Sequence, residues 1–133
     1  MIDIPDIVPL LIEASPGFAE KWAEFQAEWA DEPPLPYYLV LADFARHMCG
    51  LLSAGDEQTL KRIFAVIERL LIKGSAYVKE AATIGLLEDL QNTNLHLPDT
   101  TPEQFERFLL PESARWWKKV RAFWEEGKII TND

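Results

Sequence analysis

The stretch that decides the fold is residues 56–75, which read DEQTLKRIFAVIERLLIKGS. Its apolar residues recur every three or four positions, and most positions between them are charged. This spacing predicts an amphipathic α-helix with one apolar stripe. Asp56 is a preferred N-cap residue, Gly74 a common helix stop, and Ser75 the N-cap of a further helix. The stripe comprises Leu60, Ile63, Phe64, Val66, Ile67, Leu70 and Leu71.

The same kinds of signal on either side predict more helices and no strand. Alternation with period two is absent, and so are the Asn-Gly and Asp-Gly pairs that form hairpin turns. We expect Pro9 to kink the first helix or delay its start, Ser15 to cap the second, and Pro111 to break the sixth. The expected helices cover about residues 3–14, 15–30, 37–53, 57–73, 75–91, 101–110 and 112–126.

The length and the short connections predict one all-α domain over residues 1–133. We expect a single compact bundle of about six or seven helices, because links of two or three residues favour antiparallel neighbours. The three middle helices could stack as a helical-repeat unit, although no repeat is visible in the sequence.

Composition excludes several classes of protein. Hydrophobic residues make up 48% of the chain and charged ones 26%, the balance of a soluble globular domain. One cysteine and two histidines allow neither a disulfide framework nor a Cys/His zinc site. The first residues are acidic and no apolar run approaches the roughly 20 residues of a membrane span, so we expect a cytoplasmic protein. No catalytic or phosphate-binding motif is present, and we expect no enzyme, metal or cofactor.

The net charge of −9 is confined to the first half of the chain. Residues 1–60 hold 11 acidic and two basic side chains, whereas residues 61–133 hold 11 of each. Such an acidic half repels phosphate backbones, which argues against nucleic-acid binding. It either keeps the protein soluble or forms a landing face for a basic partner.

The helix expected over residues 15–30 has two distinct sides. Its large aromatic side chains fall within about 60° of one another and predict a core stripe. Three glutamates at four-residue spacing lie near the opposite side. Like charges at this spacing disfavour a helix by a few tenths of a kcal/mol per pair, so they form either a solvated face or a contact with a basic surface. The aromatic residues are Phe18, Trp22, Phe25 and Trp29, and the glutamates are Glu20, Glu24 and Glu28.

Acid–base chemistry has one weak candidate in the next helix. Asp43 is placed to pair with Arg46 or His47, but Cys49 lies about 160° around the helix from His47, so no nucleophile is in register. We expect Cys49 to be a small packing residue.

The helices near the carboxyl end carry the remaining ambiguous patterns. Residues 75–91 are the best candidate for the centre of the fold, with Gly85 allowing a close neighbour. Glu88 and Asp89 fall within its apolar arcs and need either a structural partner or a role in a site. In the last helix we expect the aromatic side to complete the core and the basic side to face the acidic half, although interleaved aromatic and basic residues can also bind single-stranded nucleic acid or a membrane surface. The aromatic side holds Trp116, Trp117, Val120, Phe123 and Trp124.

Several segments together resemble a family of small bacterial all-helical proteins. They are Leu41-Ala-Asp-Phe-Ala-Arg46, Gly55-Asp-Glu, Ile67-Glu-Arg-Leu-Leu71, Gly85-Leu-Leu-Glu-Asp-Leu-Gln-Asn92, Phe108-Leu-Leu-Pro111-Glu-Ser113 and Trp116-Trp117. The resemblance covers about residues 38–126. Members of that family resemble immunity proteins encoded beside polymorphic toxins, including Rhs-type and contact- or secretion-delivered effectors. The resemblance implies a cytoplasmic protein that binds a toxin domain, and it implies no catalytic residue.

We therefore expect an immunity protein whose acidic surface meets a basic toxin surface or cleft. The expected contact residues are Glu20, Glu24, Glu28, Asp31, Glu32, Tyr37, Tyr38 and Asp43. One alternative is a non-enzymatic adaptor or regulatory subunit of another cellular protein. The other is an enzyme built around carboxylates such as Asp43, Glu88 and Asp89, which metal ions would stabilise.

Overall fold

The computed structural model describes residues 1–131 and has an all-α fold, as predicted. Within this range the regular elements are helical, and Ile2 and Gly74 form an isolated β-bridge. The α-helices are α1 (Ile7–Ala14), α2 (Ala19–Glu28), α3 (Tyr37–Ala54), α4 (Glu57–Lys73), α5 (Ala76–Glu80), α6 (Glu88–Gln91) and α7 (Pro111–Glu126). A π-helical segment, η3 (Ala81–Leu87), joins α5 to α6 without a break. Short 3₁₀ turns are η1 (Ile4–Asp6), η2 (Pro16–Phe18), η4 (Thr93–Leu95) and η5 (Pro102–Phe108).

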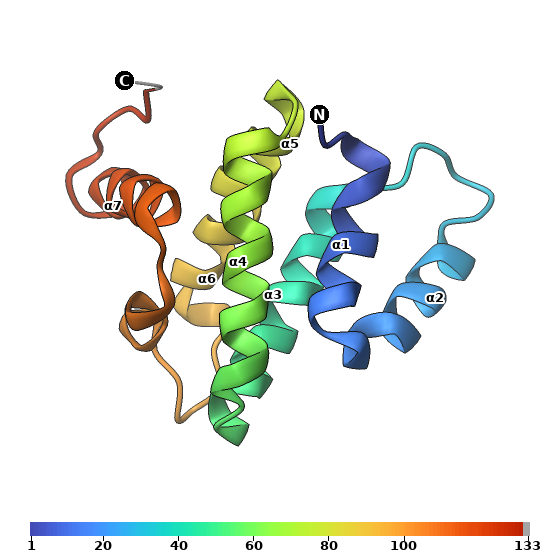
Figure 1. Ribbon diagram of the computed structural model, residues 1–133, viewed down its shortest axis with the longest axis horizontal. Helices are drawn as coiled ribbons and strands as arrows, with labels where there is room; N and C mark the ends of the chain where they lie inside the picture. Colours follow the sequence, from blue (N-terminus) through green and yellow to red (C-terminus); the bar gives the residue numbers. More distant parts are fainter. Residues whose placement is uncertain (132–133) are drawn as a thin grey trace.

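The long helices α3 and α4 form the middle of the molecule (Figure 1). The helix α4 packs against α1, α3, α5 and α7, while η3 packs against α3, α4 and α7. The predicted apolar stripe of α4 is buried along its whole length. One hydrophobic core therefore runs from α1 to α7, with α2 at its edge.

The predicted caps of α3, α4 and α5 are confirmed. Gly55 ends α3 with φ +75°, a conformation that glycine adopts without strain. The Asp56 carboxylate accepts a hydrogen bond from the Thr59 amide at 3.2 Å, and the Ser75 hydroxyl accepts one from the Val78 amide at 3.3 Å. These local contacts fix the ends of the helices independently of the rest of the fold.

Gly74 ends α4 as predicted, but packing rather than backbone conformation requires glycine there. Its φ is −77°, and an added Cβ would lie 2.3 Å from the Leu70 carbonyl oxygen and 2.5 Å from Val78 Cγ1. The crowding arises because α5 begins directly after Gly74 and brings Val78 against the last turn of α4. Beside it, the Ile2 amide donates to the Lys73 carbonyl at 2.9 Å.

One predicted helix was wrong at its start, and two other predicted boundaries differ from the structure by one to a few residues. Residues 15–30 form the turn η2 and then α2, because the Ser15 hydroxyl bonds His47 Nε2 at 2.7 Å instead of capping a helix. The first helix begins at Ile7, so Pro9 lies in its first turn, where a missing amide leaves no hydrogen bond unmade. Pro111 begins α7 rather than only ending the preceding segment, since proline suits the first helical position.

No helix in the described part of the chain combines the length and apolar character needed to cross a lipid bilayer.

Candidate partner-binding surface

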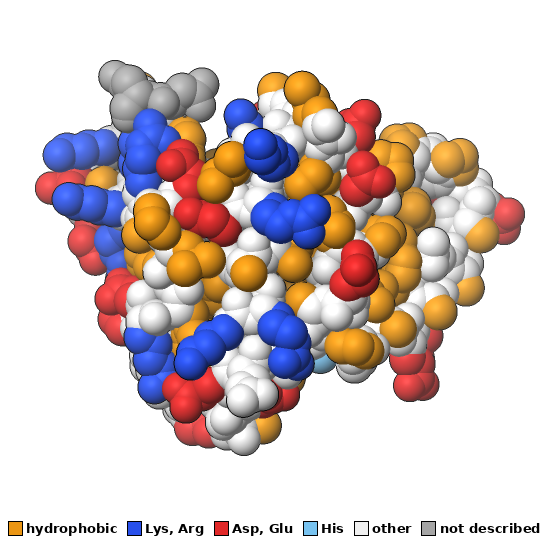
Figure 2. Space-filling model, viewed as in Figure 1, with side chains coloured by type: hydrophobic (Ala, Val, Ile, Leu, Met, Phe, Trp, Pro, Cys, Tyr) orange, Lys and Arg blue, Asp and Glu red, His pale blue; other side chains and the backbone are white. Residues whose placement is uncertain are grey.

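The five acidic residues expected to contact a partner lie on the outer side of α2 and on the turn after it. All are exposed: Glu20, Glu24, Glu28, Asp31 and Glu32. Their carboxylates form no ion pair or side-chain hydrogen bond within residues 1–131, so their charge is directed to solvent. In the view of Figure 2, Lys and Arg side chains gather over α4 and α7, and the side formed by α1 and α2 shows none.

Few side chains hold α2 on the body of the protein. Phe18 packs edge-on against Phe44 of α3 with ring centroids 4.9 Å apart, and Phe25 is buried between the two tryptophans of the helix. Trp22 and Trp29 are only half-buried, so the predicted core stripe is half right. The tryptophans stay partly in solvent because α2 lies at the edge of the bundle (Figure 1).

Asp43 is half-buried and pairs with Arg46 rather than with His47. Its Oδ1 accepts a hydrogen bond from Arg46 Nη1 at 3.1 Å. His47 is engaged with Ser15, and burial lowers the pKa of its imidazole. The Asp–His arrangement considered for acid–base chemistry is therefore not formed.

Tyr38 lies beside residues of the next long helical segment, and together they form a surface that we call the Tyr38–Ile84 face. It consists of Tyr38, Tyr77, Glu80, Ile84 and Glu88. The rings of Tyr38 and Tyr77 meet edge to face with centroids 6.2 Å apart. The two tyrosines and Ile84 are each 37–38% exposed. Tyr37 is half-buried against the core beside this face.

Gly85 permits the close approach of α3 and η3 that creates this face. A Cβ on Gly85 would lie 3.2 Å from Leu41 Cδ1 and 3.3 Å from Cδ1 of the Tyr38 ring. A side chain at this position would require Leu41 and Tyr38 to shift by a few tenths of an ångström. The π-helical turn is a second unusual feature here, and such turns occur often at functional sites.

The acidic groups at this face are in an environment that opposes ionisation. Burial and the nearby charge of Glu80 raise the pKa of Tyr38 to about 12. Burial raises the pKa of Glu88, while burial and the charge of Glu88 raise the pKa of the neighbouring Asp89 to about 7. The charge of Arg46 opposes the shift of the Asp89 pKa but is a smaller effect than burial and the charge of Glu88. Negative charge therefore exceeds positive charge at this edge.

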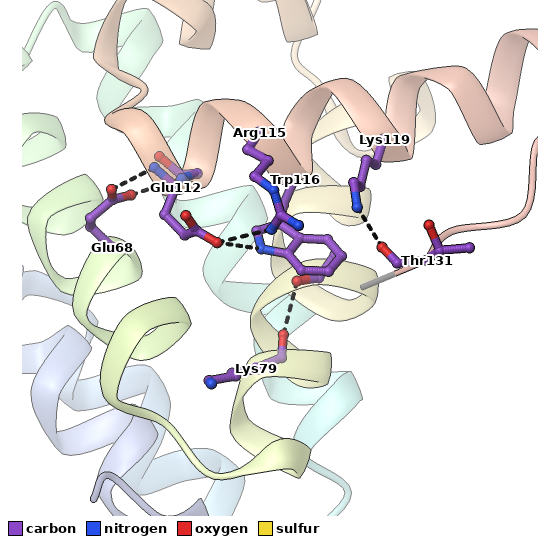
Figure 3. A network of polar contacts seen from close by, with 9 residues as sticks. Glu68, Lys79, Glu112, Arg115, Trp116, Lys119 and Thr131 are labelled. Carbon is purple, nitrogen blue, oxygen red and sulfur yellow. Dashed lines mark hydrogen bonds and ion pairs between the residues drawn. The ribbon is translucent and has the colours of Figure 1, made fainter. Parts of the chain in front are cut away.

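A cleft of about 760 Å³ lies between η3 and α7, next to the Tyr38–Ile84 face. Glu80 and Ile84 line it together with Lys79, Arg115 and Trp116. Figure 3 shows that polar groups along it bond to one another. Glu68 of α4 accepts hydrogen bonds from the Glu112 and Ser113 amides at 2.7 and 2.8 Å, which caps α7. The Glu112 carboxylate in turn accepts from Arg115 and from Trp116 Nε1 at 3.0 and 3.1 Å. The two Glu68 bonds attach α7 to α4, and the Glu112 bonds lie within α7.

The exposed end of α7 corrects two expectations. Trp117 and Val120 complete the core, but Phe123 and Trp124 are 42% and 52% exposed because the helix continues past the elements that support it. Nor does the basic side of α7 face the acidic half. Arg121 pairs instead with carboxylates of the second half, namely Glu103, Glu106 and Glu125.

The carboxylates of the enzyme alternative do not converge on a metal site. Within residues 1–131, no three His, Cys, Asp or Glu side chains are grouped so that they could hold a metal ion. Cys49 is buried, as expected of a packing residue, and burial raises the pKa of its thiol to about 11.

The fold and these surfaces define an all-helical protein whose distinguishing feature is an acidic and aromatic exterior. The chain belongs to a family described as a domain of unknown function, DUF7674, whose model matches residues 8–125. No curated protein matches the chain significantly, and no solved structure does.

Sequence reasoning missed Tyr77, Glu80 and Ile84 as candidates for the same surface as Tyr38. The signal was present, because Tyr77, Ala81 and Ile84 mark a second apolar side on the helix expected over residues 75–91. The sequence of a core helix with two apolar sides does not show which side is exposed to solvent. The positions of α3 and α7 determine that side.

Proposed function

We propose that this protein binds and neutralises a toxin effector by protein–protein contact, using its acidic surface. The observation that carries the proposal is the set of five exposed carboxylates, from Glu20 to Glu32, on α2 and the following turn. These carboxylates place much of the excess negative charge of residues 1–60 in solvent at the edge of the molecule. A protein that must capture a basic partner quickly benefits from such an arrangement, because electrostatic attraction raises association rates.

Two further features support binding rather than catalysis. The described residues form a stable helical scaffold with a continuous core, and the half-buried acids Glu88 and Asp89 lie at a helix surface rather than in the cleft beside α7. The toxin as the partner rests on the resemblance of residues 38–126 to immunity proteins. An adaptor for another cellular protein would use the same surface, so the nature of the partner separates the two functions.

The partner is identified by capture from a lysate of the source organism and then tested for toxicity. Expression of the captured domain alone should stop growth, and co-expression with this protein should restore it. A captured protein that is harmless when expressed alone would contradict neutralisation and favour an adaptor.

The role of α2 is tested by measuring association rates at low and high salt. The triple substitution Glu20→Lys, Glu24→Lys and Glu28→Lys should slow association about tenfold or more at low salt, with a smaller effect at high salt. The control makes the same change in net charge elsewhere, by Glu103→Lys, Glu125→Lys and Glu126→Lys. Because these three acids form ion pairs with Arg121 or Lys128, circular dichroism first checks that the control variant is folded. Equal slowing by both variants would show that net charge alone, and not the α2 surface, governs capture.

A further inference from the structure

The Tyr38–Ile84 face exposes apolar groups that the core does not require. The other sides of the α5–η3–α6 segment already bury a continuous set of side chains: Val78, Ala81, Ala82, Leu86, Leu87 and Leu90. Tyr77 and Ile84 point away from this set and remain more than a third exposed. Isolated exposed apolar residues are common, but here Tyr38 from a second helix adjoins Tyr77, and Ile84 follows Tyr77 by seven residues, about two helical turns along the same side. Adjoining exposed apolar residues that are flanked by polar ones are typical of protein-binding surfaces.

The charged side chains on the Tyr38 side of this apolar group are negative, whereas Lys79 and Arg115 line the cleft on the other side of Ile84. Glu80 and Glu88 belong to the face, and Asp89 follows directly. These three carboxylates form no ion pair within residues 1–131, and the nearby Arg46 is engaged by Asp43. A binding partner would have to supply positive charge on the Tyr38 side of the rim.

We propose that the Tyr38–Ile84 face is a docking site for a basic segment of a protein partner. This segment carries an aliphatic or aromatic side chain, which packs on Tyr38, Tyr77 and Ile84, and flanking Lys or Arg side chains, which pair with Glu80 and Glu88. The inference rests on the proposed function and names the place and the chemistry of the contact. It matches the general form of interfaces, in which an apolar centre is surrounded by a polar rim.

The face and the α2 surface then act on different steps of binding. Exposed charges on α2 act at long range and mainly set the association rate. Contacts on the Tyr38–Ile84 face form only in the bound complex, so their loss mainly raises the dissociation rate.

The direct test uses three synthetic hexapeptides with blocked ends, of sequence KKLLKK, KKSSKK and EELLEE, added to the full chain labelled with ¹⁵N. KKLLKK should shift the backbone amide signals of Tyr38, Tyr77, Ile84 and Glu88. KKSSKK should shift them less and EELLEE should leave them unchanged. Shifts confined to α2, or spread evenly over every acidic residue, would overturn the proposal.

The apolar contact is tested with a matched pair of substitutions. Ile84→Ser should weaken KKLLKK binding about fivefold, as expected from the loss of one buried aliphatic group. The control Ile72→Ser removes an exposed isoleucine of α4, outside this face, and should leave the affinity unchanged. Equal effects of the two substitutions would contradict the proposed contact.

The test of the docking site can fail or succeed independently of the test of neutralisation. A toxin partner whose dissociation rate is the same from the wild type and from Ile84→Ser would overturn the docking site and leave neutralisation standing. A harmless partner that dissociates faster from Ile84→Ser than from Ile72→Ser would support the docking site and overturn neutralisation.

Discussion

The helix α2 and the α5–η3–α6 segment are both exposed on one side and differ in how they are held. Two buried phenylalanines attach α2 at the edge of the molecule, and its two tryptophans are half in solvent. The α5–η3–α6 segment lies against α3, α4 and α7 and buries most of its side chains. Its exposed side is therefore presented on a rigid support, whereas the charges of α2 are carried by a lightly attached helix. Long-range electrostatic attraction depends little on the exact position of each charge, whereas close packing of side chains requires that they be held in fixed positions.

The largest expected effect comes from emptying the centre of the fold. Leu86 of η3 is fully buried, and Leu86→Ala should lower the free energy of unfolding by about 2–5 kcal/mol, through lost burial and the cavity left behind. Urea unfolding measures this loss.

Removing a buried side chain from α2 should destabilise that helix alone. Phe25→Ala removes the one buried side chain of α2, so hydrogen exchange should accelerate in residues 19–28 while α3 and α4 keep their protection. Equal loss of protection throughout the chain would show that α2 is an integral part of the core, and the contrast between the two regions would be wrong.

A moderate effect is expected from the titration of Asp89. Its pKa is raised to about 7 from the ordinary value of 3.8, so between about pH 4 and pH 7 the folded protein binds more protons than the unfolded chain. The free energy of unfolding should therefore decrease as pH rises through this window. Asp89→Asn should reduce that slope and be more stable than the wild type at pH 8, with little difference at pH 4.

Urea unfolding at several pH values checks this expectation. Glu88→Gln should act in the same direction, because burial raises the pKa of that carboxyl group as well. A wild-type slope that survives both substitutions would show that the acidic edge of the α5–η3–α6 segment does not oppose ionisation.

The smallest effect is expected in α2. Glu24 lies four residues from both Glu20 and Glu28, so Glu24→Gln removes two like-charge pairs and should stabilise the helix by a few tenths of a kcal/mol. Amide exchange in residues 19–28 at low salt detects the change, which should shrink at high salt. An unchanged exchange rate at low salt would mean that solvent already screens these charges.

Local sequence signals predicted much of the fold correctly. The ends of α3 and α4 follow from Gly55, Asp56 and Gly74, since capping depends on residues close in the chain. The apolar stripe of α4 predicted its buried face because one helix period relates its members. Ser15 misled the prediction of the second helix, since its hydroxyl bonds His47, 32 residues away.

The candidate surface could be predicted only in part. The glutamates of α2 lie opposite its aromatic stripe and are exposed in the structure, and Tyr38 was among the expected contacts. Whether they bind a partner remains a prediction. The proximity of Tyr38 to Tyr77 and Glu88 could not be predicted, because it depends on how closely α3 approaches η3.

Patterns within each segment were thus sufficient for the all-α class, the placement of excess charge in the first half and the caps of the central helices. These properties depend on composition and on contacts within a few residues. The packing of whole helices decided the π-helical turn, the exposure of Trp124 and the joining of Tyr38 to Ile84 in one face. These features arise from contacts between distant segments, which the spacing of residues within one helix does not specify.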